Sequence, residues 1–284
     1  PGIDAPNQTS HAMSKPITHL SFTRLKNLAL CPLALKNYIE SPSSSKAMDD
    51  GTLLDCIVFE PNKFEEKFFL LPENAPKKPT KAQLNAKKPS PETMKQIDRW
   101  NEMQDKIGGR IIVSQEEKED AEFLKTCIEN CSTVTFNGLM VPNDGEIGFD
   151  FQVETKFFYN GFLHRGVKDA HGKDRNGNPV IWDLKRMGAR SGEMLVRSQI
   201  RNNKYDLQAA IYCHEYDTND EPIKYYIIAV DNEGYVTPFE VTKDARRKAR
   251  IEWNALVKAA HHCNMVGLDA GPEFWADQNG FFYF

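Results

Sequence analysis

Apolar residues recur at helical spacing through the first half of the chain. Ser21 stands directly before one such run, and serine is a preferred residue at a helix N-cap. Pro32 suits the first turn of a second helix, because its missing N–H would be unpaired there in any residue. Ser114 and Glu117 have the spacing of a capping box. The pattern predicts helices after Ser21, from Pro32 to about Tyr38, and over 46–59, 92–107 and 114–131.

From about residue 147 the pattern changes to the alternation typical of strands. The segment GFDFQVETKFFYNGFLHRGVKDA alternates apolar and polar residues, and Asn160-Gly161 within it is a hairpin turn signal. A second turn, DRNGNP, precedes the β-rich run PVIWDLK. Further helices are expected near 192–201, 204–216 and 243–263, with strands in KYYIIAVD and YVTPFEVT. This order predicts an α/β or α+β fold with one central mixed sheet flanked by helices.

The 284 residues fit one large domain over 14–284. Residues 1–13 are polar, and we interpret them as a tail or processing remnant with Met13 as a plausible native start. Segment 72–92 holds five prolines and many lysines, which predicts a mobile surface segment. A membrane helix is not expected, because no run of about 18 apolar residues occurs. The six cysteines do not suggest a disulfide scaffold, which favours a reduced, cytoplasmic setting.

Net charge gives no indication of nucleic-acid binding, because it is −4 with a pI near 6.0. Local clustering of basic residues is more informative. Two of three basic stretches are as well explained by a solvated face: Lys77, Lys78, Lys81, Lys87 and Lys88, and Lys243, Arg246, Arg247, Lys248 and Arg250. The third directly follows the candidate site described below and is predicted to contact phosphates: Arg186, Arg190, Arg197, Arg201 and Lys204.

Candidate chemistry lies in Asp183-Leu184-Lys185, which is expected to end an apolar strand. Because side chains alternate along a strand, Asp183 and Lys185 should point to the same face and Leu184 to the other. Asp169 is expected to end the preceding strand, and the turn between the strands brings the two ends together. The prediction is a site with two carboxylates and one lysine.

Two neighbouring carboxylates repel each other in a dry site, and a hard divalent cation compensates that repulsion. Ligands that are all oxygen suit Mg²⁺ or Mn²⁺. Such a metal lowers the pKa of bound water and neutralises charge that develops at phosphorus. A surface salt bridge at a hairpin is the alternative, because the D-x-K pattern by itself is common.

Several segments together resemble the RecE-type exonucleases (exodeoxyribonuclease VIII and its phage relatives), within the PD-(D/E)XK nuclease superfamily. LSFTRLKNLALCPLALKNYIESP is similar to the opening helices of that family, and GTLLDCIVFEPNKFEEKFFLLP to its next element. HRGVKDA and VIWDLKR resemble the two metal-ligand strands. YDLQAAIYCHEY resembles the Q-x-x-x-Y helix shared with RecB-like nucleases. The resemblance covers about 20–265 and implies the PD-(D/E)XK fold.

The resemblance also implies roles for individual residues. Lys185 would be the catalytic lysine, while Gln208 and Tyr212, four apart on one helix face, would look onto the site. Glu154 would be a further acidic ligand, with Glu146 as its competitor. The implied metal ligands are Asp169, Asp183, the Leu184 carbonyl, Asp55 and Glu154.

This chain departs from the family pattern at two of these places. Asp55 stands where the family usually has the histidine of a G-T-x-x-H segment, and Arg186 follows the D-x-K motif where threonine is common. Asp55 is either an oxygen ligand in place of imidazole or a half-exposed residue that leaves metal affinity reduced. Whether one metal or two would bind is left open by this substitution.

The function implied by the resemblance is exonucleolytic degradation of linear double-stranded DNA, in the 5′→3′ direction, to give single-stranded tails for recombination. The implied partners are double-stranded DNA ends, a single-strand annealing protein and further copies of the chain in a ring. Two alternatives stay open. One is a structure-specific or single-strand nuclease on the same fold, and the other is a non-catalytic DNA-binding accessory protein.

Overall fold

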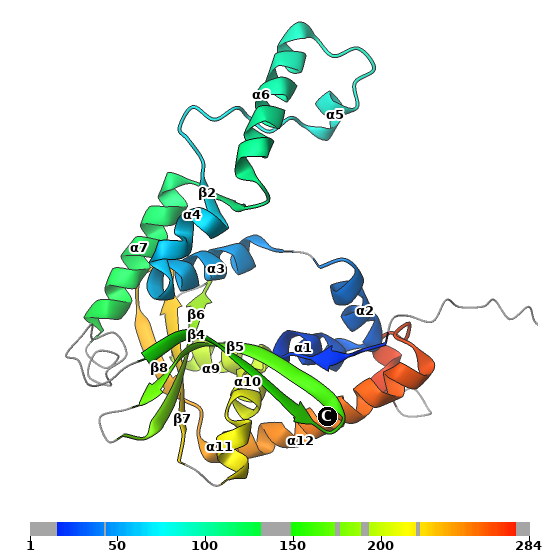
Figure 1. Cartoon of the computed structure of the whole chain (residues 1–284), viewed down its shortest axis with the longest axis vertical. Coiled ribbons are helices and arrows are strands. Elements are labelled where there is room, and N and C mark those ends of the chain that lie inside the picture. The colour runs from blue at the N-terminus through cyan, green and yellow to red at the C-terminus, as the bar shows by residue number, and fades with distance from the viewer. Residues whose placement is uncertain are drawn as a thin grey trace, which may run out of the picture.

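A mixed sheet forms the centre of the protein in a computed structural model that describes residues 16–42, 44–131, 149–173, 177–188, 193–219 and 222–276 (Figure 1). Its strand order is β1-β5-β6-β7-β8, with β4 paired to β5. The pairs β1–β5 and β6–β7 are parallel and the others are antiparallel, which confirms the predicted mixed sheet. The strands are β1 His19–Leu20, β4 Phe149–Tyr159, β5 Phe162–Lys173, β6 Pro179–Met187, β7 Lys224–Asp231 and β8 Val236–Glu240.

Helices cover both faces of this sheet (Figure 1). On one face, Leu54 and Leu124 pack with Trp182 of β6. On the other face, Leu25, Leu207 and Trp253 share a larger core with the sheet. The helices of the first face are α3 Lys46–Phe59 and α7 Gln115–Asn130. The other helices of the body are α1 Phe22–Leu30, α2 Pro32–Glu40, α9 Glu193–Asn202, α10 Tyr205–Tyr212, α11 His214–Thr218, α12 Lys243–Val266 and the 3-10 turn Pro272–Trp275.

Local signals in the sequence explain where several elements begin and end. The Ser21 side chain accepts a hydrogen bond from the Arg24 N–H, and Ser114 forms the predicted capping box with Glu117. Asn160 and Gly161 have φ angles of 45° and 81°, as the tight hairpin turn between β4 and β5 requires. The single helix predicted over 204–216 was wrong, because the chain turns at Cys213 and separates α10 from α11.

A smaller unit projects from the body (Figure 1). Its base is a pair of parallel strands that the sequence did not predict, and its outer part is formed by α5 and α6. The segment predicted to be mobile contains α5, whose N-terminus has a capping box between Thr80 and Gln83; mobility itself stays a prediction. The elements are a 3-10 turn Pro61–Lys63, α4 Phe64–Lys67, β2 Phe68–Leu70, α5 Lys81–Leu84, α6 Pro91–Ile107 and β3 Ile111–Val113.

Among the described helices, none is both long enough and apolar enough to cross a lipid bilayer.

Candidate functional site

Asp169 and Asp183 lie at the point where pairing between β5 and β6 stops. The ladder runs from Lys173–Pro179 to Ala170–Trp182, and the two aspartates come next. Instead of continuing the ladder, Asp169 Oδ2 accepts a hydrogen bond from the Leu184 N–H at 2.8 Å. The expectation that each aspartate ends its strand was wrong, because both strands continue beyond them. The predicted proximity is nevertheless present, and it arises from the divergence of two paired strands.

A break in the alternation of β5 accounts for this divergence. Lys168 and His171 both contact Tyr216, although residues three apart on a regular strand point to opposite faces. Ala170, between them, packs on the other face of the sheet. On the neighbouring strand β4, Gln152 has a φ of 52° and lies across from Asp169, between two regular pairs. Because both strands are irregular at this point, the Asp169 side chain does not follow the regular alternation of the sheet.

Asp183 is the most buried of the acidic residues in this group, with 1% of its surface exposed. Its Oδ1 accepts a hydrogen bond from Gln208 Nε2 at 2.9 Å. Its Oδ2 lies 2.6 Å from the Lys185 ammonium, which also sits 5.2 Å from the centre of the Tyr205 ring. The predicted shared face of Asp183 and Lys185 is thus confirmed. Lys185 is held by a carboxylate on one side and an aromatic ring on the other.

Electrostatic coupling links these residues with Asp55 of α3. Burial, followed by repulsion from Asp183 and Asp55, raises the pKa of Asp169 well above its usual value. Burial also raises the pKa of Asp183, against the opposing effect of Lys185. The pKa of Asp55 rises to about 7, mainly through burial. Burial alone would lower the pKa of Lys185, but Asp183 and Asp169 reverse this and raise it. Lys185 therefore stays protonated at neutral pH.

Helix α10 brings both of its predicted residues to this cluster. Gln208 contacts Asp183 directly. Tyr212 packs on the backbone of Gly166, where an added Cβ would lie 2.4 Å from the Tyr212 ring. Burial and the charge of Asp183 raise the pKa of the Tyr212 hydroxyl to about 12, so that it remains a neutral hydrogen-bonding group. Gly166 is thus required for the close approach of α10 to β5.

Oxygen donors predominate in this cluster, which fits a hard cation such as Mg²⁺ better than a soft metal. Asp169 and Asp183 repel each other at close range, and a divalent cation would remove the repulsion. Within the described residues, however, no group of three or more His, Cys, Asp or Glu side chains is arranged to hold a metal ion. Asp55 is coupled electrostatically to the two aspartates, and its role as a metal ligand stays a prediction.

The structure does not bring Glu154 into this cluster. Its side chain is 68% exposed and forms an ion pair with Lys156 on the same strand. Among the charges that shift its pKa, Lys156 is followed by Arg165, and both lower it. Its competitor Glu146 lies outside the described residues.

The basic residues from Arg186 to Lys204 make separate contacts in the described part of the chain. Arg186 donates a hydrogen bond from Nε to Asn232, and Arg197 lies over the Phe239 ring. Lys204 forms an ion pair with Glu252 at 2.5 Å. Arg201 is exposed on α9, and Arg190 lies outside the described residues. Phosphate contact by these residues stays a prediction.

Three neighbours of the cluster were not predicted from the sequence: Tyr205, Tyr225 and Lys26. Tyr205 begins α10, three residues before Gln208, so helical spacing was a signal for it. Tyr225 on β7 is completely buried, and its pKa is raised well above its usual value by burial and then Asp183. Lys26 donates a hydrogen bond to Asn203 at 2.8 Å, and its pKa is lowered by burial and then by Lys185. No local pattern connects Lys26 of α1 with a site so distant in sequence.

Comparison with known proteins bears on the fold. No protein-family model matches the chain, and no curated protein matches it. One similar solved structure is the crystal structure of a "putative exonuclease" from Eubacterium rectale, with a TM-score of 0.54 and 13% identity. The match covers 94% of this chain and 88% of that one. The two chains share a fold. The structure of SSO0001, with a TM-score of 0.30, 12% identity and coverage of 80% and 90%, is too dissimilar to inform it.

Proposed function

We propose that this protein is a divalent-metal-dependent exonuclease of the RecE type, with a PD-(D/E)XK site, that degrades linear double-stranded DNA from its ends. The observation that carries the proposal is the convergence of Asp169, Asp183 and Lys185 where β5 and β6 diverge. The fold shared with an exonuclease-named protein adds support for nuclease activity of this general kind.

Asp169 and Asp183 would hold the metal, with the Leu184 carbonyl completing the protein ligands and Asp55 contributing charge nearby. Mg²⁺ or Mn²⁺ bound there would lower the pKa of a water molecule and neutralise charge on the scissile phosphate. The buried position of Asp183, together with its hydrogen bond from Gln208, fixes one carboxylate oxygen in place before substrate arrives. Such preorganisation reduces the reorganisation that the reaction requires.

Lys185 has a specific part in this proposal. Because its pKa is raised, Lys185 stays protonated at neutral pH and cannot act as a general base. It would donate hydrogen bonds to the attacking water and to a phosphate oxygen instead, so that its role is electrostatic and positional. In the hydrolysis, water oxygen bonds to phosphorus, the P–O3′ bond breaks, and the leaving oxygen takes up a proton. The water loses its proton to solvent.

The wider biological role follows from the same resemblance. Removal of one strand in the 5′→3′ direction would leave single-stranded tails for recombination, for which a single-strand annealing protein is the natural partner. A ring of identical subunits around the duplex would keep the enzyme on its substrate. These partners, like the metal, belong to the proposal.

Cleavage of end-labelled DNA tests the proposal. Wild-type protein with Mg²⁺ should shorten linear duplex and leave covalently closed circular DNA intact, and EDTA should stop the reaction. Asp183→Asn should lower the rate by about 10²–10³-fold, because a preorganised charge at the reacting phosphate is removed.

Glu154→Gln is the matched control, since it makes the same carboxylate-to-amide change at an exposed position. This variant should keep a rate within about threefold of wild type, as most surface substitutions away from a site do. Wild-type activity that Asp183→Asn fully retains would refute the proposed site. Nicking of closed circles would instead favour the endonuclease alternative, and intact linear DNA would favour a non-catalytic protein.

A further inference from the structure

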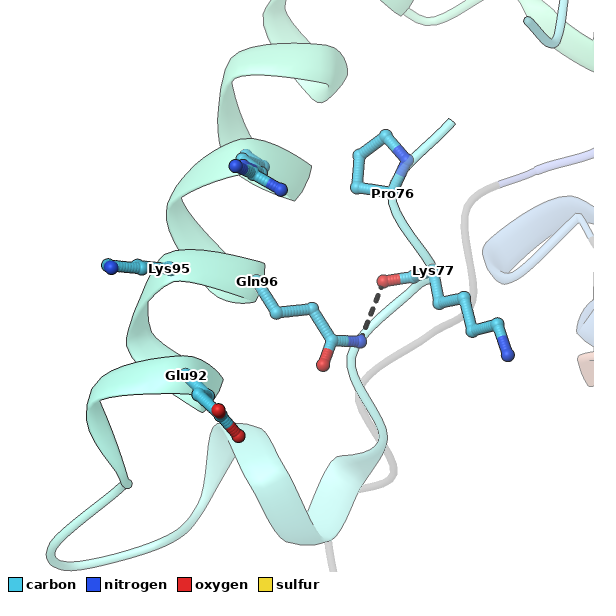
Figure 2. Close-up of a pocket in the computed structure, with 6 residues that line it drawn as sticks. Pro76, Lys77, Glu92, Lys95 and Gln96 are labelled. Atoms are coloured by element: carbon cyan, nitrogen blue, oxygen red, sulfur yellow. Dashed lines mark hydrogen bonds between the residues drawn. The ribbon is translucent and has the colours of Figure 1, made fainter. Parts of the chain in front are cut away.

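A second charged region lies far from the sheet, on the projecting unit. Between Pro76-Lys77 and α6, the protein has a cleft of about 350 Å³ (Figure 2). The lining residues are Pro76, Lys77, Glu92, Lys95, Gln96 and Arg99. Helices α5 and α6 and their connections, residues 72–110, form this region, which we call the arm.

Side-chain hydrogen bonds join the two walls of the cleft. Gln96 Nε2 donates to the Lys77 carbonyl at 2.9 Å, and the Gln83 amide donates to Gln96 Oε1 at 3.2 Å. A single side chain of α6 thereby fastens both the extended segment and α5. The base of the arm is fixed separately, because β2 and β3 pair and the Leu71 N–H donates to the Val113 carbonyl. The charged side chains of the arm therefore project from a segment that is held by hydrogen bonds at the cleft and at its base.

The arm has a charge opposite to that of the whole chain. Residues 76–99 contain seven lysines and arginines against two acidic residues, whereas the chain as a whole has a net charge of −4. Three of these cations line the cleft: Lys77, Lys95 and Arg99. None of the three has an ion-pair partner in the described part of the chain. Their charge is available to an external anion.

The directions of these side chains indicate the kind of anion. A single bound phosphate requires donors that converge on one point. Lys77 and Lys95 instead point away from each other, on opposite sides of the cleft (Figure 2). Cations that point in different directions from one folded unit can each contact a different charge of a polymer that carries several negative charges. A nucleic-acid backbone, with one phosphate per nucleotide, has that form.

We infer that the arm binds the phosphate backbone of duplex DNA, through Lys77, Lys95 and Arg99, at a place separate from the Asp169–Asp183–Lys185 cluster. The choice of DNA over an acidic protein rests on the proposed function, since a nuclease must hold the duplex beyond the bond it cuts. Contacts with phosphates do not distinguish base sequences, so the arm would bind duplexes of different sequence with the same affinity.

Binding of a fluorescent 30-base-pair duplex, followed by anisotropy in EDTA, tests this inference without cleavage. The variant Lys77→Gln with Lys95→Gln should bind roughly tenfold more weakly at moderate salt. The slope of log affinity against log salt concentration should fall by about 2, one for each phosphate that the variant no longer neutralises. Two unrelated sequences should show the same weakening. Replacement of both lysines by arginine keeps the charge and should restore wild-type binding.

Lys248→Gln with Lys258→Gln is the matched control, because it removes two lysines that are exposed on α12 instead of the arm. This control should change affinity by less than about twofold. Equal binding by the arm variant and wild type would overturn the inference, as would absence of DNA binding by wild type. Poly-glutamate bound through Lys77 and Lys95 while DNA binding is unaffected would overturn it in favour of an acidic protein partner.

The inference and the proposed function can fail separately. Asp183→Asn should lose cleavage and keep arm-dependent binding. Intact cleavage together with arm-independent binding would remove the inference and leave the proposed function standing. Arm-dependent binding by a wild-type protein that does not cleave DNA would refute the proposed function and leave the inference about the arm standing.

Discussion

The sheet region and the arm differ in how they use charged residues. In the sheet region, Asp183 and Lys185 are withdrawn from water, paired with each other and shifted in pKa. In the arm, Lys77 and Lys95 are exposed and unpaired among the described residues. Burial makes a few charges strong at short range, which chemistry at one phosphate requires. Exposed charges are individually weak in water, but a cluster of the same sign can together attract a polyanion.

Substitutions in the core beside the sheet are expected to lower the stability of the protein more than substitutions in the arm. Trp253 of α12 is completely buried and lies 4.4 Å from the Tyr159 ring, whereas Trp100 of α6 is only partly buried. Trp253→Ala should lower the free energy of unfolding by about 4 kcal/mol, the usual cost of a large cavity in a core. Trp100→Ala should cost about 1 kcal/mol. Urea denaturation measures both changes, and equal values would contradict the comparison.

The neighbouring carboxylates should lower stability when no metal is bound. The pKa of Asp55 is about 7 in the folded protein and near 3.8 when unfolded. The folded state therefore binds the extra proton between these values, and stability falls as pH rises towards 7. Asp55→Asn should raise the free energy of unfolding by about 2–4 kcal/mol at pH 8 in EDTA.

That gain should fall to about 1 kcal/mol at pH 4.5, where Asp55 is protonated in the folded protein and still mostly ionised in the unfolded chain. Asp98→Asn, on the exposed surface of α6, should show no such pH dependence. A destabilised Asp55→Asn variant at pH 8 would mean that the carboxylate has a favourable partner, and the electrostatic account of the cluster would be wrong.

The loss of stability at acid pH should come from a different buried residue, His164. His164 is fully buried beside Phe157 and Trp253, and burial lowers its pKa to about 4 from an ordinary 6.5. Because the unfolded chain binds the proton first, stability is complete above pH 6.5 and is lost as pH falls towards 4. His164→Phe should remove about 2 kcal/mol of that loss, measured as melting temperature against pH.

The exposed His262 supplies the control for this prediction. His262→Phe should leave the acid dependence of the melting temperature unchanged. Parallel acid curves for wild type and His164→Phe would show that other groups cause the loss.

The sequence predicted most elements whose signals are local. Ser21, Ser114 and the Asn160-Gly161 turn all act within four residues of themselves, and the structure has the caps and the turn where they were expected. The short strands β2 and β3 were not predicted, because their pairing depends on a partner more than 40 residues away.

Several residues of the candidate site were predicted to lie together, but their geometry was not predicted. Alternation placed Asp183 and Lys185 on one face, and helical spacing placed Gln208 and Tyr212 together. The irregularity opposite Gln152, which turns Asp169 towards Leu184, has no sequence signal of comparable strength. Glu154 was predicted because related nucleases carry an acidic residue on the corresponding strand, and in this chain it is exposed and paired with Lys156.

The most direct measurement is the anomalous scattering of Mn²⁺ in crystals of the wild-type protein. The proposed metal site requires a peak between the carboxylates of Asp169 and Asp183, within about 2.0–2.4 Å of an oxygen from each. A peak bound elsewhere, for example at Glu154, with none between Asp169 and Asp183 at millimolar Mn²⁺, would contradict it.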